Sequence, residues 1–302
     1  MTSDLAVETR GLTRLHGRKR AIDGLDLALP RGGIHAVVGA NGAGKSTLFR
    51  LLLGFQRADA GECFVLGRHA DALTPADRGR IGFVNEEHTL PGWARVDTVL
   101  GIQRQHYADR WDARAFDAVI ASFDLSGRQR IGQLSRGERA GFNLALALAQ
   151  SPELLILDEP TLGLDVVARR RVLDALILAV GESARTIVYC SHQIDEVERL
   201  ADTLLVLERG RLASFSTPDA LCDRITYWIA DLPFKGPDRD AIPGLLQHQQ
   251  IDGVHHYLVI DQGDGFEAFL RALGARTVQA MPVPLDRAVD AFLTRNHAGP
   301  AR

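Results

Sequence analysis

The chain has 302 residues, 46% hydrophobic and 24% charged, with 35 basic against 38 acidic side chains. This composition excludes an extended disordered chain, which lacks the apolar side chains needed to offset the entropy of ordering. The formal charge of −3 disfavours binding of nucleic acid through a strongly basic surface. The length fits one large domain or two smaller ones.

Cysteine spacing and hydropathy limit the cellular compartment in which the chain can act. Cys63, Cys190 and Cys222 lie far apart, so neither a disulfide framework nor a thiolate zinc site is indicated, and a reducing compartment fits. The first ten residues include Asp4 and Glu8 and have no apolar run, so we expect no secretory signal. No window approaches the roughly 20 apolar residues that span a bilayer. Any membrane role therefore requires a partner chain.

The first third of the chain predicts strands around one helix. Residues 5–30 alternate apolar and polar positions about a turn-rich centre at 16–19, which predicts short antiparallel strands. Residues 34–38 are a β-branched run, and a glycine-rich loop and a helix over 46–54 follow. We expect a second pair of strands at 63–66 and 81–84.

The middle of the chain alternates helices with short apolar strands. Residues 91–150 are helical in pattern, and we expect the later elements to be strands at 154–157, 186–190 and 203–207 and helices at 166–180 and 196–200. This alternation predicts an α/β fold with a mostly parallel sheet and helices on its faces.

The alternation stops after Ser216. Thr217 and Pro218 are typical of a helix N-cap with proline at the first helical position. A Pro, Gly and Asp cluster over 233–243 indicates a loop, and we expect a strand at 257–260 and helices at 265–273 and 285–293. These elements predict a small C-terminal α+β domain over 217–302, after a first domain over 1–216.

A glycine-rich segment fits the pattern G-x-x-x-x-G-K-[ST] of phosphate-binding loops. Its backbone N–H groups and the following helix N-terminus would bind phosphate oxygens, Lys45 would reach the outer phosphates, and Ser46 would be a ligand of Mg²⁺. The placement between a strand and a helix favours this reading over a chance glycine loop. The segment comprises Gly39, Ala40, Asn41, Gly42, Ala43, Gly44, Lys45, Ser46 and Thr47.

Two adjacent acids follow the apolar run at 154–157. A buried strand with carboxylates at its C-terminal end presents them to the ligand crevice of an open α/β sheet. We expect Asp158 to hold the magnesium shell and Glu159 to polarise the attacking water. The alternative is a strand that ends in a solvated acidic turn.

Three further segments make the chain resemble the ABC ATPases. Residues 134–138, Leu-Ser-Arg-Gly-Glu, resemble the LSGGQ signature; residues 161–165, Thr-Leu-Gly-Leu-Asp, resemble the D-loop; and Ser191-His192 resembles the switch histidine. The resemblance covers roughly residues 5–216 and is greatest to the single-cassette ATP-binding subunits of ABC-2-type exporters. It implies a P-loop NTPase fold with an N-terminal antiparallel β-subdomain and a helical subdomain at about 87–150.

The resemblance also implies a mechanism. Two cassettes, in a homodimer or a pseudo-symmetric heterodimer, would face head to tail and trap two ATP molecules, with Ser135 and Gly137 of one chain completing the site of the other. His192 would hydrogen-bond the γ-phosphate, and Asp165 would couple the two sites. The subunit would hydrolyse ATP to power a separate membrane permease for export, from the cytoplasmic face of the membrane.

The chain departs from the family pattern at three places. Glu86 stands where the Q-loop usually has glutamine; it can still bind magnesium, and its extra charge predicts a steeper dependence on the metal. His16 takes the place of the aromatic that stacks on adenine, or else is a surface turn histidine. Arg136 and Glu138 replace glycine and glutamine of the signature, whereas Ser135 and Gly137 are kept.

Two alternatives to a transport ATPase remain. A soluble ABC ATPase acting on ribosomes or DNA is disfavoured by a single P-loop, by the absence of sustained heptads over 48–133 and by the mild acidity. A regulatory module without turnover is disfavoured by Glu159 and His192. Trp93 follows the Q-loop and lies either at the groove for a permease helix or in the core of the helical subdomain.

Overall fold

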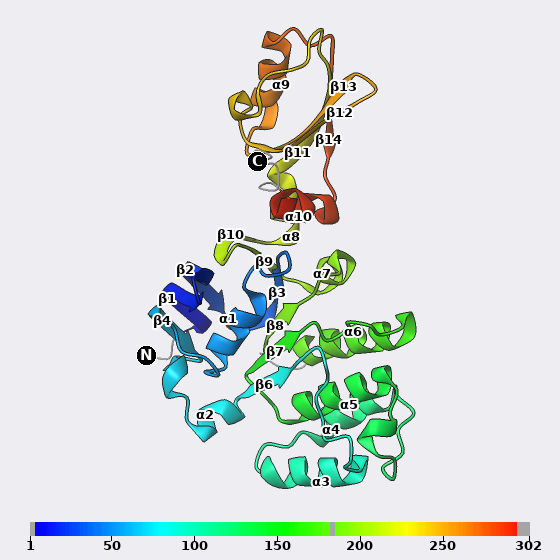
Figure 1. Ribbon diagram of the computed structural model, residues 1–302. Coiled ribbons are helices and arrows are strands. Elements are labelled where there is room, and N and C mark those ends of the chain that lie inside the picture. Colours follow the sequence, from blue (N-terminus) through cyan, green and yellow to red (C-terminus); the bar gives the residue numbers. More distant parts are fainter. Residues whose placement is uncertain (1–3, 182–184, 295–302) are drawn as a thin grey trace. The chain divides into compact units, whose positions relative to one another are not determined.

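The computed structural model describes residues 4–181 and 185–294. The chain divides into two compact units, Met1–Leu212 and Ala213–Arg302, and the boundary falls within one strand (Figure 1).

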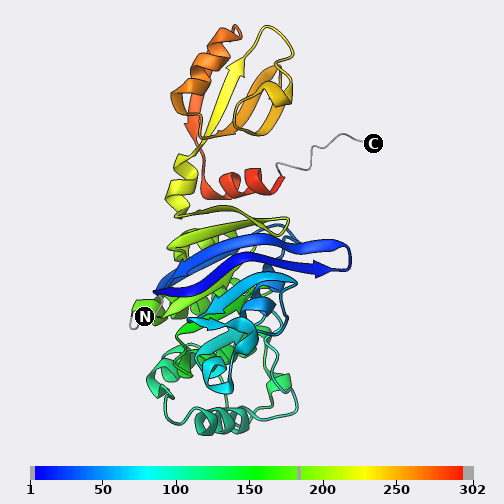
Figure 2. The ribbon, with the colours of Figure 1, turned by 90° about the vertical axis from the view of Figure 1, so that its left-hand side faces the viewer.

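The first unit opens with an antiparallel sheet in the order β2-β1-β4-β5. Its two long strands form the dark blue ribbon in Figure 2. Every second residue of β2, at Leu25, Leu27 and Leu29, is buried, as expected where one face of a sheet covers a core. The strands are β1 (Leu5–His16), β2 (Lys19–Pro30), β4 (Ala60–Val65) and β5 (Arg68–His69).

The second sheet of this unit has six strands in the order β10-β9-β3-β8-β7-β6. The pairs β3–β8, β3–β9, β7–β8 and β6–β7 are parallel, which confirms the mostly parallel core. The two strands expected at 63–66 and 81–84 are confirmed as β4 and β6, and they belong to different sheets: β4 pairs with β1, and β6 pairs with β7. The strands are β3 (Gly33–Val38), β6 (Ile81–Val84), β7 (Leu154–Asp158), β8 (Thr186–Cys190), β9 (Thr203–Glu208) and β10 (Arg211–Ser216).

Apolar clusters lie on both faces of the six-stranded sheet. One contains Leu48 and Leu52 of α1, and the other contains Phe142 of α5 and Leu176 of α6. This double covering explains why β8 is buried throughout and β7 is buried at every position except Asp158, rather than alternating. The helices are α1 (Lys45–Leu52), α2 (Pro75–Gly79), α3 (Val96–His106), α4 (Ala113–Ile120), α5 (Arg136–Ala149), α6 (Val166–Gly181) and α7 (Ile194–Leu200), with 3₁₀ turns at Ala70–Ala72 and Ile131–Gln133.

The second unit is a four-stranded antiparallel sheet, in the order β12-β13-β11-β14, with three helices. One face packs Trp228 and Tyr257 against Phe266 and Leu270 of α9. The predicted helix cap is confirmed, because Thr217 Oγ1 accepts a hydrogen bond from the Ala220 N–H. The elements are α8 (Pro218–Asp223), β11 (Ile225–Asp231), the 3₁₀ turn η3 (Arg239–Ala241), β12 (Leu245–Ile251), β13 (Val254–Ile260), α9 (Gly263–Ala272), β14 (Thr277–Pro282) and α10 (Leu285–Thr294).

In the part of the chain that the structure describes, we find no helix with both the length and the apolar character needed to cross a bilayer.

Candidate functional site

The loop between β3 and α1 requires glycine at two places for different reasons. Gly44 has φ +112°, and a Cβ there would lie 2.4 Å from the Ala21 carbonyl oxygen. Gly39 has an ordinary φ, but a Cβ would lie 2.6 Å from the Leu207 carbonyl oxygen. Larger side chains would push this loop away from the strands beside it, so the glycines hold its N–H groups at the end of the sheet.

Lys45 is the first residue of α1 and only 7% exposed. Its Nζ donates to the carbonyl oxygens of Gly39 at 2.6 Å and Ala40 at 3.3 Å. The ammonium group therefore lies over its own loop, held by neutral acceptors that an anionic phosphate oxygen would replace.

The other charged groups follow four strands that lie side by side in the sheet, β3, β8, β7 and β6. The phosphate loop follows β3, His192 follows β8, Asp158 and Glu159 end β7, and Glu86 follows β6. Since parallel strands end at one edge, groups distant in the sequence meet there.

Asp158 lies near a hydroxyl group and a second carboxylate, those of Ser46 and Glu86. Burial raises the pKa of its carboxyl, a hydrogen bond from the Ser46 hydroxyl lowers it, and the charge of Glu86 raises it again. The described residues contain no cluster of three or more His, Cys, Asp or Glu side chains suited to a metal. Two carboxylates and a hydroxyl nonetheless fit Mg²⁺, which completes its shell with water and substrate phosphates.

Glu159 is held by the backbone and by His192. It is 5% exposed and has φ +52°, which is uncommon for a residue with a Cβ and is often found at functional sites. The Nε2 of His192 lies 3.1 Å from Oε1, and the His192 N–H donates to Oε2 at 3.2 Å. Burial raises the pKa of Glu159, and His192 opposes this rise.

These groups line one cavity of about 280 Å³. Lys45, Ser46, Glu86, Asp158, Glu159 and His192 all face it. His16 also lines it and lies 3.4 Å from Thr47 Oγ1, so it is more than a distant turn residue. Lys19 lines the cavity too, and its Nζ lies 3.4 Å from where a Cβ on Gly42 would be. Sequence reasoning missed Lys19 because it belongs to no motif.

The signature segment does not line this cavity. Ser135 caps α5: its Oγ accepts from the Glu138 N–H at 3.2 Å, and its own N–H donates to Glu138 at 2.7 Å. Glu138 therefore completes a capping box, which gives a structural reason for its presence. A Cβ on Gly137 would lie 2.7 Å from the Cβ of Ala168, so close packing against α6 also selects glycine.

Arg136 and Asp165 are likewise placed by local structure. The Arg136 guanidinium lies against Gly163, where a Cβ would approach Nη1 to 2.7 Å. Asp165 Oδ1 accepts from the N–H groups of Val167 and Ala168, each at 2.9 Å, at the start of α6. These hydrogen bonds lower the pKa of Asp165, the one from Ala168 most. Asp165 does not line the cavity either.

A buried carboxylate behind the site was missed by sequence reasoning. Glu196 Oε2 accepts hydrogen bonds from Thr161 Oγ1 at 2.8 Å, Tyr189 OH at 2.5 Å and Ser191 Oγ at 2.7 Å. Arg169 lies 3.5 Å from the other oxygen. Glu196 thereby joins the segment after Glu159 to the segment before His192. Its only sequence signal is an acid on the apolar side of a short helix.

A second cavity of about 280 Å³ shares Ser46, Glu86 and Asp158 with the first. Phe55 and Phe83 line it as an edge-to-face pair with ring centroids 6.4 Å apart, and Phe55 is 62% exposed. Trp93 does not line this cavity, but it is 80% exposed, so it is not part of the core of the helical subdomain.

Comparison with known proteins finds similar sequences. The family model described as "ABC transporter" matches residues 22–162. The daunorubicin resistance ATP-binding protein DrrA3 of Streptomyces coeruleorubidus is 34% identical, over 94% of this chain and 93% of its own. The Nod factor export ATP-binding protein I of Burkholderia orbicola is 32% identical, over 82% and 83%. The aliphatic sulfonates import ATP-binding protein SsuB 1 of Nocardia farcinica is 37% identical, over 80% and 98%.

Solved structures share the fold. An ATP-binding subunit of an ABC transporter superposes with a TM-score of 0.65 at 21% identity, covering 72% of this chain and 92% of its own. A dimeric ATP-binding cassette in a post-hydrolysis state, bound to ADP and phosphate, superposes with a TM-score of 0.59 at 21% identity, covering 70% and 98%.

Proposed function

The chain belongs to the ABC transporter ATP-binding proteins, and from this premise we propose how its residues bind and hydrolyse ATP to drive a separate membrane permease. The observation that carries the proposal is the single cavity into which Lys45, Ser46, Asp158, Glu159 and His192 converge from three neighbouring strand ends. A phosphate cradle, a cation site and a buried base are thus combined at one edge of the sheet.

ATP binding uses the loop and its rim. The N–H groups of residues 39–47 and the N-terminus of α1 bind the phosphates, and Lys45 exchanges its two carbonyl acceptors for phosphate oxygens. His16 lies on the adenine side, where its exposed ring can stack. Lys19, at the same rim, adds positive charge near the phosphates.

Ser46, Asp158 and Glu86 are the residues that would hold Mg²⁺. When bound, the ion neutralises phosphate charge and orients the outer phosphates. Burial, and then the charge of Glu86, raise the pKa of Asp158. A divalent ion held by these carboxylates would favour their ionised form.

Hydrolysis is assigned to Glu159 and His192. Glu159 accepts a proton from water while the water oxygen forms a bond to the γ-phosphorus and the bond to the ADP oxygen breaks. His192, already in contact with the Glu159 carboxylate, donates a hydrogen bond to the γ-phosphate. Lys45 and His192 together stabilise the charge that develops on the transferred group.

The signature supports a head-to-tail dimer. Ser135 and Gly137 lie at the N-terminus of α5, a position suited to phosphate, yet they do not line the cavity of their own chain. A second cassette would bring them to the γ-phosphate, and Asp165 would then lie at the interface as a link between the two sites.

Export by a separate permease is the transport role we propose. The relatives concerned with daunorubicin resistance and Nod factor export match 94% and 82% of this chain. The alignment with the daunorubicin resistance protein covers 94% of this chain, so it includes most of the C-terminal unit. The sulfonate importer shows that the cassette alone does not set direction. Exposed Phe55 and Trp93 offer apolar contacts for a permease helix, which would hold the subunit on the cytoplasmic face of the membrane.

Phosphate release by the chain co-purified with its permease tests this function. We expect ATP-dependent release that Lys45→Ala abolishes and that Lys235→Ala, at an exposed lysine of the C-terminal unit, leaves unchanged. Absence of release from the complex would contradict the proposal and favour a regulatory module without turnover. Equal release with Lys45→Ala would contradict it as well, because the hydrolysis would then not use the phosphate loop.

A further inference from the structure

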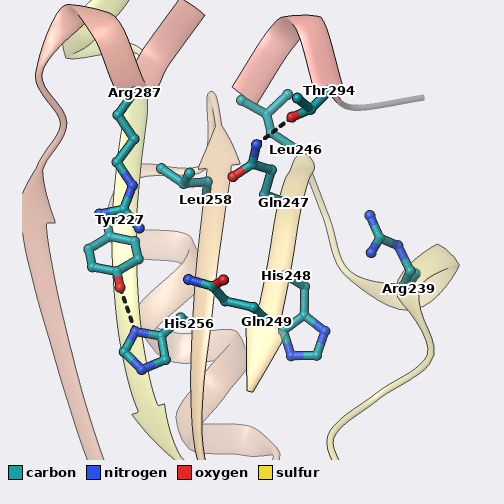
Figure 3. A pocket seen from close by; sticks show the side chains of 10 residues that line it. All are labelled: Tyr227, Arg239, Leu246, Gln247, His248, Gln249, His256, Leu258, Arg287 and Thr294. Atoms are coloured by element: carbon teal, nitrogen blue, oxygen red, sulfur yellow. Dashed lines mark hydrogen bonds between the residues drawn. The ribbon is translucent and has the colours of Figure 1, made fainter. Parts of the chain in front are cut away.

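The C-terminal unit contains a cavity of about 340 Å³ that the ATP reaction does not use (Figure 3). Its volume is in the range of small-molecule sites. The floor is one face of the sheet, where strand register places Tyr227 opposite Leu258 and Leu258 opposite Gln247. The next row on that face pairs His256 with Gln249. The opposite face of the sheet is the apolar one that packs against α9.

The cavity is lined by cations and by neutral polar groups. Arg287 of α10 extends over the Tyr227 ring, with its guanidinium carbon 3.8 Å from the ring centroid. The Tyr227 hydroxyl in turn shares a hydrogen bond of 2.5 Å with His256 Nδ1. Arg239, from the 3₁₀ turn η3, lines the cavity beside His248. The Tyr227 ring thus holds one guanidinium in place while its N–H edges stay available.

Among the residues that the structure describes, no carboxylate lines this cavity and neither arginine forms an ion pair. Asp290 does not line the cavity, but it accepts a hydrogen bond from Gln247 Nε2 at 3.3 Å. Burial lowers the pKa of His248, and the charges of His255 and Arg239 lower it further. The Nε2 of this ring lies 3.0 Å from His255 Nδ1. Two unpaired guanidinium groups around a concave polar floor favour a negatively charged occupant.

We propose that this cavity binds a small organic anion bearing a carboxylate or phosphate group. Arg287, over the Tyr227 ring, pairs with the acidic group, and Arg239, beside His248, adds positive charge at the other side of the cavity. The amides of Gln247 and Gln249 bind polar substituents, and Leu258 with the Tyr227 ring contacts the carbon skeleton. The site lacks the glycine-rich loop and helix N-terminus of the ATP cavity, so its recognition is independent of the nucleotide reaction.

The test is an NMR titration of the full-length chain that follows the ring signals of His256 and His248, assigned with His256→Gln and His248→Gln. The probes are citrate for the carboxylate source, glycerol 3-phosphate and AMP for the phosphate source, and glycerol as the neutral control. We expect a saturable shift with at least one anion and none with glycerol. Arg287→Gln and Arg239→Gln should each weaken that binding at least 10-fold.

The matched control is Arg271→Gln, which removes an exposed arginine of α9 that pairs with Glu267 outside the cavity. Circular dichroism tests whether each variant is folded. Arg287→Lys replaces Arg287→Gln if Arg287→Gln does not fold. The proposal is overturned if none of the anions shifts the two histidines saturably, or if Arg271→Gln weakens binding as much as the cavity variants do. The anion that binds most tightly identifies carboxylate or phosphate as the recognised group.

Discussion

The Nε2 of His192 lies 3.1 Å from Oε1 of Glu159, and the N–H of the same histidine donates to Oε2 at 3.2 Å. The residue proposed as the base and the residue proposed to bind the γ-phosphate are therefore in direct contact. Because Glu159 has φ +52°, β7 ends in an uncommon conformation that points this carboxylate toward His192.

The Glu159–His192 contact predicts a characteristic pH dependence. Burial raises the pKa of Glu159 and His192 lowers it, so removal of His192 should raise the pKa further. A base acts only when ionised; hydrolysis should therefore fall as the pH falls through this pKa, and His192→Ala should move the acid limb to higher pH. It should also lower the rate by roughly 10²-fold or more. Rates of phosphate release from pH 5 to 9 measure both the position of the acid limb and the loss of rate. An acid limb that His192→Ala leaves unmoved would show that His192 does not affect the ionisation of Glu159.

Glu86 predicts an unusual response to magnesium. Its full charge lies near Asp158 and would repel the γ-phosphate without the metal. Glu86→Gln should therefore bind ATP more tightly at low Mg²⁺, and its activity should rise less steeply with Mg²⁺ and approach the wild-type rate at saturation. Glu87→Gln, at the exposed neighbouring position, is the control. Identical curves of activity against Mg²⁺ concentration for wild type and Glu86→Gln would refute this prediction.

Glu196 should matter for stability and turnover together. Glu196→Ala leaves three buried hydroxyl groups and Arg169 without their acceptor and should lower the free energy of unfolding by about 3–5 kcal/mol. Glu196→Gln keeps an acceptor oxygen and should cost less, yet reduce hydrolysis more than ATP affinity. Denaturant unfolding, nucleotide binding and phosphate release measure these effects. The exposed Glu198 of the same helix gives the control Glu198→Gln, and equal effects at both positions would count against the network.

His88 predicts a loss of stability on acidification. It is 1% exposed, and burial, aided by the charge of Arg136, lowers its pKa from 6.5 to about 4. Between these values the unfolded chain binds a proton that the folded chain does not, so stability falls as the pH falls from 6.5 to 4. The contribution is on the order of 1–3 kcal/mol.

His88→Asn should remove this part of the pH dependence, since asparagine tolerates the φ of +48° at this position. Urea unfolding at pH 7 and pH 4.5 measures the change, with exposed His106→Asn as the control. A wild-type and a His88→Asn protein that lose equal stability over this interval would refute the assignment.

The sequence predicted the parallel core well because its strands are buried on both faces. Uninterrupted apolar runs such as 154–157 have no other stable location, and the motif residues follow their ends. The phosphate loop, Asp158, Glu159 and His192 line one cavity as the resemblance implied. Lys19 and Glu196 were not predicted from the sequence, because each reaches the site through a tertiary contact that no local sequence pattern indicates.

The C-terminal unit was predicted less completely. Its helices at 263–272 and 285–294 were expected from their apolar periodicity. Strands β11, β12 and β14 were not, because β12 is rich in glutamine and β14 is almost fully exposed, so neither alternates clearly. The polar side chains that obscure the strand pattern of β12 also form part of the floor of the arginine-lined cavity.

The mass of Glu159→Gln, measured by light scattering with and without ATP and Mg²⁺, tests most directly whether two chains share the ATP sites. With hydrolysis blocked and the cradle intact, we expect an ATP-dependent dimer that the added change Ser135→Arg abolishes, while each chain still binds nucleotide. A chain that stays monomeric with saturating ATP, or one that dimerises equally with Ser135→Arg, would contradict a site shared between two signature-bearing cassettes.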